Sequence, residues 1–157
     1  MKRPVLVLAT AALVVGIGGG YWWRGATSTP QAPLFAAADT VAGAALYQAN
    51  CAACHGANLE GAEDWQTPGA DGRLPPPPHD ESGHTWHHGD MLLFNYTELG
   101  GAEALARQGV AYDSGMPGFA DTLTDAQIVD ILAFIKSTWP ERERQAQAAR
   151  SEAERNP

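Results

Sequence analysis

Apolar residues recur at helical spacing near the end of the chain and define its clearest predicted helix. Four of them fall at i, i+3, i+4 and i+7 and share one face: Ile128, Ile131, Leu132 and Ile135. Thr124 precedes this stripe, and Gln127 stands three residues after Thr124, which is the pattern of a capping box at a helix N-terminus. Pro140 ends the predicted helix, because proline cannot continue it.

Small residues mark a second predicted helix in the stretch DTVAGAALYQAN, residues 39–50. Gly43 and Tyr47 recur there at helical spacing, and such a face would let this helix cross the apolar stripe closely. A third helix is predicted from Asp90 to Gly100, and a short fourth in AEALARQ, residues 102–108. No segment alternates polar and apolar residues for long, so the fold class is predicted to be all-α.

The beginning of the chain is strongly apolar. Lys2 and Arg3 are followed by a run at residues 4–23 without a charged side chain, ending in Tyr-Trp-Trp. Twenty helical residues span ~30 Å, about one bilayer core, and aromatic residues favour the membrane interface. A cleaved signal peptide is the alternative, but the nearest small-residue cleavage pattern, at residues 36–38, follows too late. We therefore favour a transmembrane anchor over residues 1–23, and either interpretation exports the rest of the chain.

Composition divides that remainder into three segments. Residues 24–38 are small, polar and proline-bearing, which is typical of a flexible linker. Residues 140–157 alternate Glu, Arg and Ala without a large apolar side chain, which predicts a solvated helical extension or a frayed tail. Residues 39–139 are left as one domain.

Both cysteines of the chain lie in NCAACHGANLEG, residues 50–61. Cys51 and Cys54 form a C-x-x-C pair that His55 follows directly. A structural zinc site needs four ligands, and a thioredoxin-like dithiol expects a preceding strand where this chain has a predicted helix. The pattern C-x-x-C-H is instead the signature of haem c attachment, in which the two thiols bond to the haem vinyl groups and the histidine becomes an axial iron ligand. One such motif predicts one covalent haem c.

Charge is concentrated in the same domain. Residues 39–139 hold 14 acidic residues against three basic ones, a formal charge of −11. This acidity argues against nucleic acid as a partner. It favours a redox partner protein with a basic docking surface, because complementary charge speeds encounter, although acidity that serves solubility alone would look the same.

The order of these features resembles the class I cytochrome c family. The segments GAALYQANCAACHG (43–56), MPGF (116–119) and LTDAQIVDILAFIKSTWP (123–140) carry the resemblance, which covers roughly residues 39–139. They are similar to membrane-associated monohaem cytochromes of proteobacteria. The resemblance implies three to five helices wrapped around one covalent haem c, and single-electron transfer between respiratory or photosynthetic complexes.

The resemblance also implies a second axial ligand, a methionine that precedes a proline in a loop. Met1 lies outside the domain, and Met91 falls in the first turn of a predicted helix, where a core role is the better interpretation. Met116 stands in YDSGMPGFADTLT, whose glycines and proline prevent a helix, and a loop can hold a thioether against iron. We therefore expect His55 and Met116 to be the axial iron ligands. A filled sixth position argues against a peroxidase.

The stretch WQTPGADGRLPPPPHDESGHTWHHG, residues 65–89, is predicted to surround the haem. In the family, a carbonyl of the proline region accepts the Nδ1–H of the ligating histidine, and Pro77 or Pro78 could supply it. Trp86 and one neighbouring histidine are expected to pack the haem edge and hydrogen-bond the propionates. Two alternatives involve His84, His87 and His88. One is a copper or other metal site that uses all three, and the other is a bis-histidine haem in which one of them replaces Met116.

The sequence therefore predicts a membrane-tethered electron carrier rather than an enzyme. Its single span would lie in the inner membrane with the haem domain in the periplasm, or the protein would be soluble in the periplasm after signal cleavage. Two other functions stay open. One is a fixed cytochrome subunit of an oxidase or dehydrogenase complex, and the other is a copper-handling protein that uses the histidines of residues 84–88.

Overall fold

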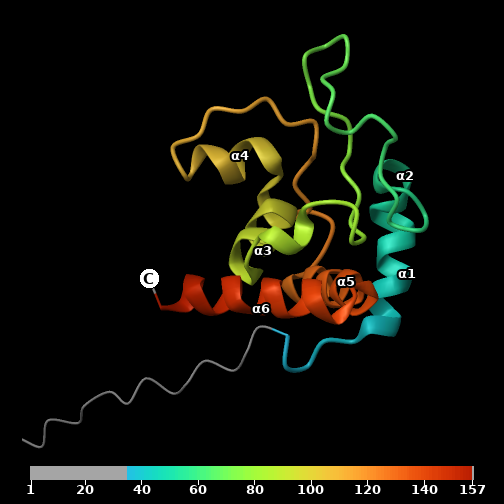
Figure 1. Cartoon of the computed structure of the whole chain (residues 1–157), viewed down its shortest axis with the longest axis vertical. Coiled ribbons are helices and arrows are strands. Elements are labelled where there is room, and N and C mark those ends of the chain that lie inside the picture. Colours follow the sequence, from blue (N-terminus) through green and yellow to red (C-terminus); the bar gives the residue numbers. More distant parts are fainter. Residues whose placement is uncertain (1–34, 157) are drawn as a thin grey trace, which may run out of the picture. The chain divides into compact units, whose positions relative to one another are not determined.

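The structure is a computed structural model, and it describes residues 35–156 (Figure 1). The elements of this part are α1 (Thr40–Asn50), α2 (Ala52–His55), the 3-10 helix η1 (Thr85–His87), α3 (Asp90–Leu99), α4 (Gly101–Ala106), α5 (Asp125–Thr138) and α6 (Glu141–Arg155). No strand occurs between residues 35 and 156, which confirms the all-α prediction for this part of the chain.

The predicted membrane anchor, residues 1–23, lies outside the described residues, as does most of the predicted linker. Within residues 35–156, none of the helices has the length and apolar character needed to cross a bilayer. The end of the linker is described, and it packs on the domain. Phe35 is partly buried against the core, with Lys136 Nζ 3.9 Å from the centroid of its ring.

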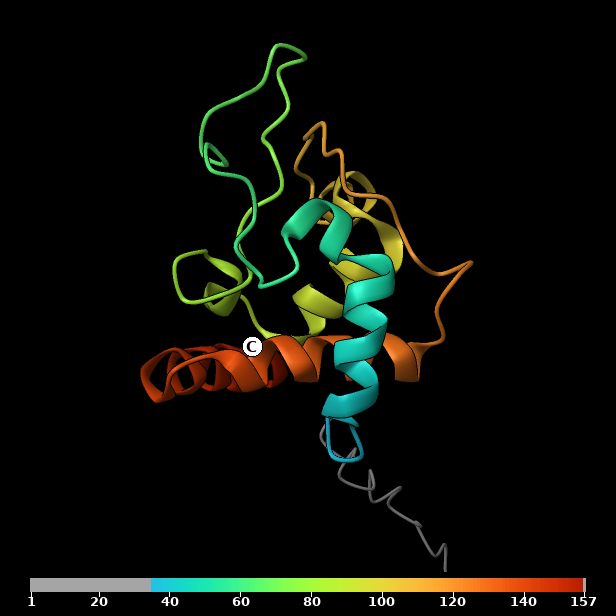
Figure 2. The same ribbon diagram turned by 90° about the vertical axis from the view of Figure 1, so that its right-hand side faces the viewer.

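The two predicted long helices cross as expected, with α1 passing over α5 (Figure 2). The Asp39 side chain caps α1 by accepting the backbone N–H groups of Val41 and Ala42. Both halves of the predicted capping box are present at the start of α5. At the crossing, a Cβ added to Gly43 would lie 2.0 Å from the Asp130 carbonyl oxygen. Only glycine therefore fits at this point of α1.

The core lies where α1, α3 and α5 meet. The four residues of the predicted stripe are all buried, between 0% and 4% exposed, and Tyr47 and Trp139 are at most 1% exposed. Other buried members are Leu59, Leu93, Phe94, Leu123 and Val129. Burying a large apolar side chain contributes about 1.5–3 kcal/mol, so this cluster is the main source of stability of the described part.

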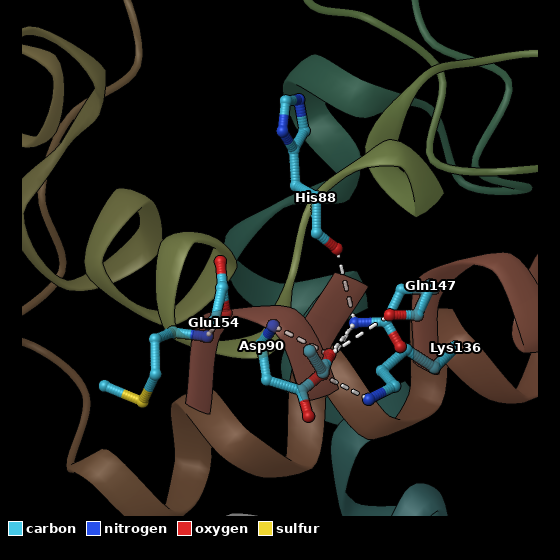
Figure 3. Close-up of polar contacts among 7 residues, drawn as sticks. His88, Asp90, Lys136, Gln147 and Glu154 are labelled. Carbon is cyan, nitrogen blue, oxygen red and sulfur yellow. Dashed lines mark hydrogen bonds and ion pairs between the residues drawn. The ribbon is translucent and has the colours of Figure 1, made fainter. Parts of the chain in front are cut away.

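The C-terminal helix α6 forms the helical extension predicted for residues 140–157, but it is not wholly solvated, because it packs on the domain through polar side chains. Gln147 and Ser151 are 1% and 3% exposed. The Gln147 amide donates to Asp90 Oδ1 (2.7 Å), to Ser151 Oγ (2.9 Å) and to the His88 carbonyl oxygen (3.3 Å). Lys136 of α5 also contacts Asp90 Oδ1, at 2.5 Å (Figure 3).

Further contacts from α6 cap α3, which begins at Asp90 without a side-chain cap of its own. Ser151 Oγ accepts the Asp90 N–H (3.0 Å), and the Glu154 carboxylate accepts the Met91 N–H (3.0 Å). An acidic group is favourable at a helix N-terminus, where the first N–H groups lack partners within the helix. The extension α6 therefore supplies the N-terminal cap of α3. Hydrophobic periodicity could not predict this packing, because residues 140–157 contain no large apolar side chain.

Replacing Gln147 with alanine is expected to lower the free energy of unfolding by about 1–3 kcal/mol, because Asp90 Oδ1 and the His88 carbonyl lose a buried donor. Amide exchange at Asp90 and Met91 should become faster, since their N–H groups are held by α6. Hydrogen exchange followed by mass spectrometry measures this directly. Gln145→Ala on the exposed face of α6 is the control, and equal exchange in both variants would contradict the capping role.

Candidate functional site

The two cysteines and His55 project from the short turn of helix that follows α1. Cys51 ends α1 and begins α2, and residues three and four apart share a helix face. Both thiols are free, with Cys51 half-buried and Cys54 exposed. Burial, and then the proximity of Cys54, raise the pKa of the Cys51 thiol to about 11. A redox dithiol needs a thiol with a lowered pKa, so this environment argues against a thioredoxin-like pair.

Tyr47 of α1 fixes the far end of α2. Its hydroxyl donates to the Gly56 carbonyl oxygen at 2.9 Å and lies 3.4 Å from the His55 carbonyl oxygen. Gly56 has a φ of +83°, which favours glycine and turns the chain out of the helix directly after His55. The tyrosine thus joins the Cys-x-x-Cys-His turn to the α1–α5 core.

We expect Tyr47→Phe to lower the free energy of unfolding by about 1–2 kcal/mol, because the ring is kept but the partly buried carbonyl of Gly56 loses its donor. Denaturant unfolding of the purified protein measures this change. Tyr112→Phe, at an exposed tyrosine, is the matched control and should change stability little. If the two variants unfold alike, the hydroxyl contributes nothing to the site.

The proline-rich segment lies along the residues that follow α2. The Ala62 N–H donates to the Pro76 carbonyl oxygen (2.9 Å), and the His79 N–H donates to the Leu59 carbonyl oxygen (2.8 Å). Gly61 is needed here, since a Cβ would lie 2.3 Å from the backbone nitrogen of Pro78. These contacts bring the segment against His55.

His55 Nδ1 lies 2.8 Å from the Pro77 carbonyl oxygen. A carbonyl only accepts, so Nδ1 carries the hydrogen and Nε2 keeps its lone pair. The side chain is 8% exposed, and this burial lowers the pKa of His55, while the contact with Pro77 acts in the opposite direction. The side chain is therefore a neutral imidazole whose Nε2 lone pair is available, which is the form in which histidine binds metals.

Met116 is half-buried in the irregular loop between α4 and α5. The loop is tied to the α3–α4 corner, because the Gly101 N–H donates to the Met116 carbonyl oxygen (3.1 Å) and the Phe119 N–H to that of Thr97 (3.1 Å). A Cβ on Gly118 would lie 2.6 Å from the Leu99 carbonyl carbon, so the approach is close. The loop that carries Met116 is thus held in place by backbone contacts.

An ion pair joins the two loops that carry the candidate residues. Arg73, in the segment that leads to Pro77, lies 2.9 Å from Asp113, three residues before Met116. In both ribbon views these loops extend on the same side of α5 (Figures 1 and 2). Both partners are well exposed, so the pair contributes little to stability.

The donor set on this side of the molecule suits haem c. It offers two free thiols on one helical turn, a neutral imidazole beside them with Nε2 uncommitted, and a thioether on a fixed loop. Thiols can form the two thioether bonds, and imidazole with thioether is an axial pair that favours a high potential. Cys51, Cys54, His55 and Met116 are therefore the residues that would hold the group.

The loop HTWHH is organised by aromatic stacking. The Trp86 indole N–H donates to the Glu81 carbonyl oxygen (3.3 Å), and its ring stacks on His87 with centroids 3.7 Å apart. His84 stacks on Trp65 at 5.2 Å and meets His88 edge-on at 5.4 Å. The Trp86 N–H is thus engaged within its own loop, although its part in haem packing stays a prediction.

The alternative metal site of three histidines is not formed in the described residues. Within residues 35–156 no three His, Cys, Asp or Glu side chains are grouped so as to hold a metal ion. The physical reason is that His84 and His87 stack on different tryptophans, Trp65 and Trp86. Spacing along the sequence suggested one helical face, but η1 is a single turn and does not provide it.

One histidine near the site was missed by the sequence reasoning. His79 stacks on His55 with ring centroids 4.1 Å apart and an interplanar angle of 24°. Its spacing from the four other histidines does not point to His55, because its place depends on the backbone pairing between residues 59–62 and 76–79. Its position directly after the four prolines was the only local clue.

Comparison with protein families found that the family model described as Cytochrome c matches residues 40–139. This is more than half of the chain, and it includes the cysteine turn, the proline-rich segment and the methionine loop. Comparisons with curated proteins and with solved structures found no match.

Proposed function

Because this chain belongs to the cytochrome c family, whose members carry covalently attached haem c, we propose that it is a membrane-tethered monohaem electron carrier. Haem c supplies an iron that takes up and releases one electron. Cys51 and Cys54 would hold the group through thioether bonds, and His55 and Met116 would supply the imidazole and thioether ligands of its iron. With both axial positions filled, the protein transfers electrons and does not bind a substrate at the iron.

The observation that carries this proposal is the contact between His55 Nδ1 and the Pro77 carbonyl oxygen, at 2.8 Å. It fixes the tautomer, so that Nε2 is the nitrogen available to iron, and it raises the basicity of the ligand. A purely structural role for His55 would not explain why two free thiols lie on the same helical turn. The thioether of Met116 favours the ferrous state and so raises the reduction potential.

A redox titration of the purified holoprotein tests the function. We expect a single reversible transition that involves one electron, with a positive potential and a low-spin spectrum in both oxidation states. His55→Ala should lose the low-spin spectrum. A haem that binds carbon monoxide or peroxide readily in the wild type would overturn the proposal, because its iron would then have an open position.

The tether is supported by the uncharged run at residues 4–23, behind Lys2 and Arg3. We place the single span in the inner membrane and the haem domain in the periplasm. Fractionation of the producing cells, with N-terminal sequencing of the mature chain, tests this. The haem protein should stay in the membrane after a high-salt wash and be released by detergent. A mature chain that begins near residue 39 would mean cleavage and a soluble periplasmic carrier.

The proposed partner has a basic docking surface. Most acidic side chains of residues 39–139 are exposed, and each of the three basic residues is paired with an acidic one: Arg73 with Asp113, Arg107 with Glu103 and Lys136 with Asp90. Rates of electron exchange with a basic redox protein should therefore fall as ionic strength rises. A rate that does not depend on salt would show that the acidity serves solubility. A haem protein that purifies only as part of a large complex would favour the fixed-subunit alternative.

A further inference from the structure

His79 places a second imidazole against the face of the candidate axial ligand. The rings of His55 and His79 are close to parallel, with an interplanar angle of 24° and centroids 4.1 Å apart. His79 is two residues beyond Pro77, whose carbonyl oxygen holds His55 Nδ1. The same short segment of chain therefore touches the His55 ring at its edge and on its face.

His79 is itself fixed by contacts from several elements. Its Nδ1 lies 2.8 Å from Thr85 Oγ1, and the Thr85 hydroxyl is directed at the Pro78 carbonyl oxygen (3.4 Å), so its oxygen accepts from Nδ1–H. The His79 carbonyl oxygen accepts from the indole N–H of Trp139 at 2.7 Å, and Trp139 is 1% exposed. The position of this imidazole is thus set by the core.

These contacts restrict different motions of the ligand. The hydrogen bond to Pro77 fixes one atom of the His55 ring, but by itself it allows the ring to tilt about that contact. A flat, anchored ring on its face opposes the tilt. An aliphatic side chain at position 79 would fill space without defining a plane.

From this geometry we infer that His79 is a positioning residue that holds the plane of the His55 imidazole at the iron. The inference rests on the proposed function, since it takes His55 as an axial ligand. Orientation of a ligand plane controls how the imidazole orbitals meet those of iron, so it affects the electronic structure of the ferric state and the reduction potential.

The test compares ferric holoprotein of the wild type with His79→Leu, His79→Phe and Thr85→Val. Electron paramagnetic resonance g-values and the NMR shifts of the haem methyl groups report the ligand plane. We expect His79→Leu to change both and to shift the potential, while the visible spectrum stays that of the wild-type axial pair. His79→Phe keeps a flat ring and should restore most of the wild-type pattern. Thr85→Val keeps the imidazole but removes its anchor, and should change the g-values.

His87→Leu is the matched control, because that imidazole also stacks on an aromatic ring, but it is exposed and stacks on Trp86. The inference is overturned if His79→Leu keeps the g-values and potential of this control, whatever happens to thermal stability. Should His79→Leu fail to mature, unchanged g-values in Thr85→Val overturn it instead. Failure of the proposed function looks different: His55→Ala would then keep the wild-type low-spin spectrum.

Discussion

Replacing Met116 with alanine should remove the second axial ligand and lower the reduction potential of the holoprotein. The thioether sulfur is a soft donor that favours ferrous iron, and axial ligands set the potential of haem over about 0.8 V in proteins. We expect a fall on the order of 0.1 V or more. The weak red absorption band that ferric iron shows with a thioether ligand should also disappear. Redox titration and the oxidised spectrum measure the two effects.

Met91→Ala is the control for this experiment. Met91 is 47% exposed on α3, so the core role expected for it from the sequence is wrong. Its loss should leave both the potential and the red band as in the wild type. If Met116→Ala keeps the band and the potential, another residue occupies that position. A wild type without the red band and with a low potential would instead indicate the bis-histidine alternative, in which one of the histidines of residues 84–88 replaces Met116.

Replacing Gly43 with alanine should destabilise the protein, although alanine is the better helix former. Helix propensity alone would favour the alanine variant by about 1 kcal/mol. The added Cβ, however, would lie 2.0 Å from the Asp130 carbonyl oxygen and 2.5 Å from its carbonyl carbon, so α1 and α5 must move apart. We expect a net loss of about 2–4 kcal/mol in the free energy of unfolding. Denaturant unfolding followed by helical circular dichroism measures it.

Ala45→Gly provides the comparison, because Ala45 is exposed on the same helix. It should cost only the helix propensity difference, about 1 kcal/mol. The crossing geometry would be contradicted if Gly43→Ala proved as stable as the wild type or more stable. An unchanged stability would mean that the two helices lie farther apart than the contact at Asp130 requires.

Much of this fold follows from local patterns. The stripe on α5, its capping box and the small face of α1 each specify one helix and one contact, and together they fix the α1–α5 crossing. The Cys-x-x-Cys-His turn is equally local, since its chemistry depends on residues three and four apart. These features could be predicted because each depends only on residues that are close together in the sequence.

Other features depend on residues that are far apart in the chain. The helix α6 packs through Gln147 and Ser151 on the start of α3, and a polar surface of this kind has no hydrophobic periodicity to reveal it. His79 meets His55 only because residues 59–62 pair with the proline-rich segment. The three histidines of the HTWHH loop show the reverse case. Their spacing allowed a shared metal site as an alternative, but stacking on Trp65 and Trp86 separates His84 from His87.

The most direct measurement is the mass and colour of the mature polypeptide from a host that can attach haem to cysteines. We expect a red protein whose mass exceeds that of the polypeptide by one haem, and whose haem stays bound after denaturation and acid extraction. Replacing Cys51 and Cys54 together with serine should make the haem extractable or abolish its incorporation. A colourless wild-type polypeptide without added mass would show that the chain does not carry covalent haem.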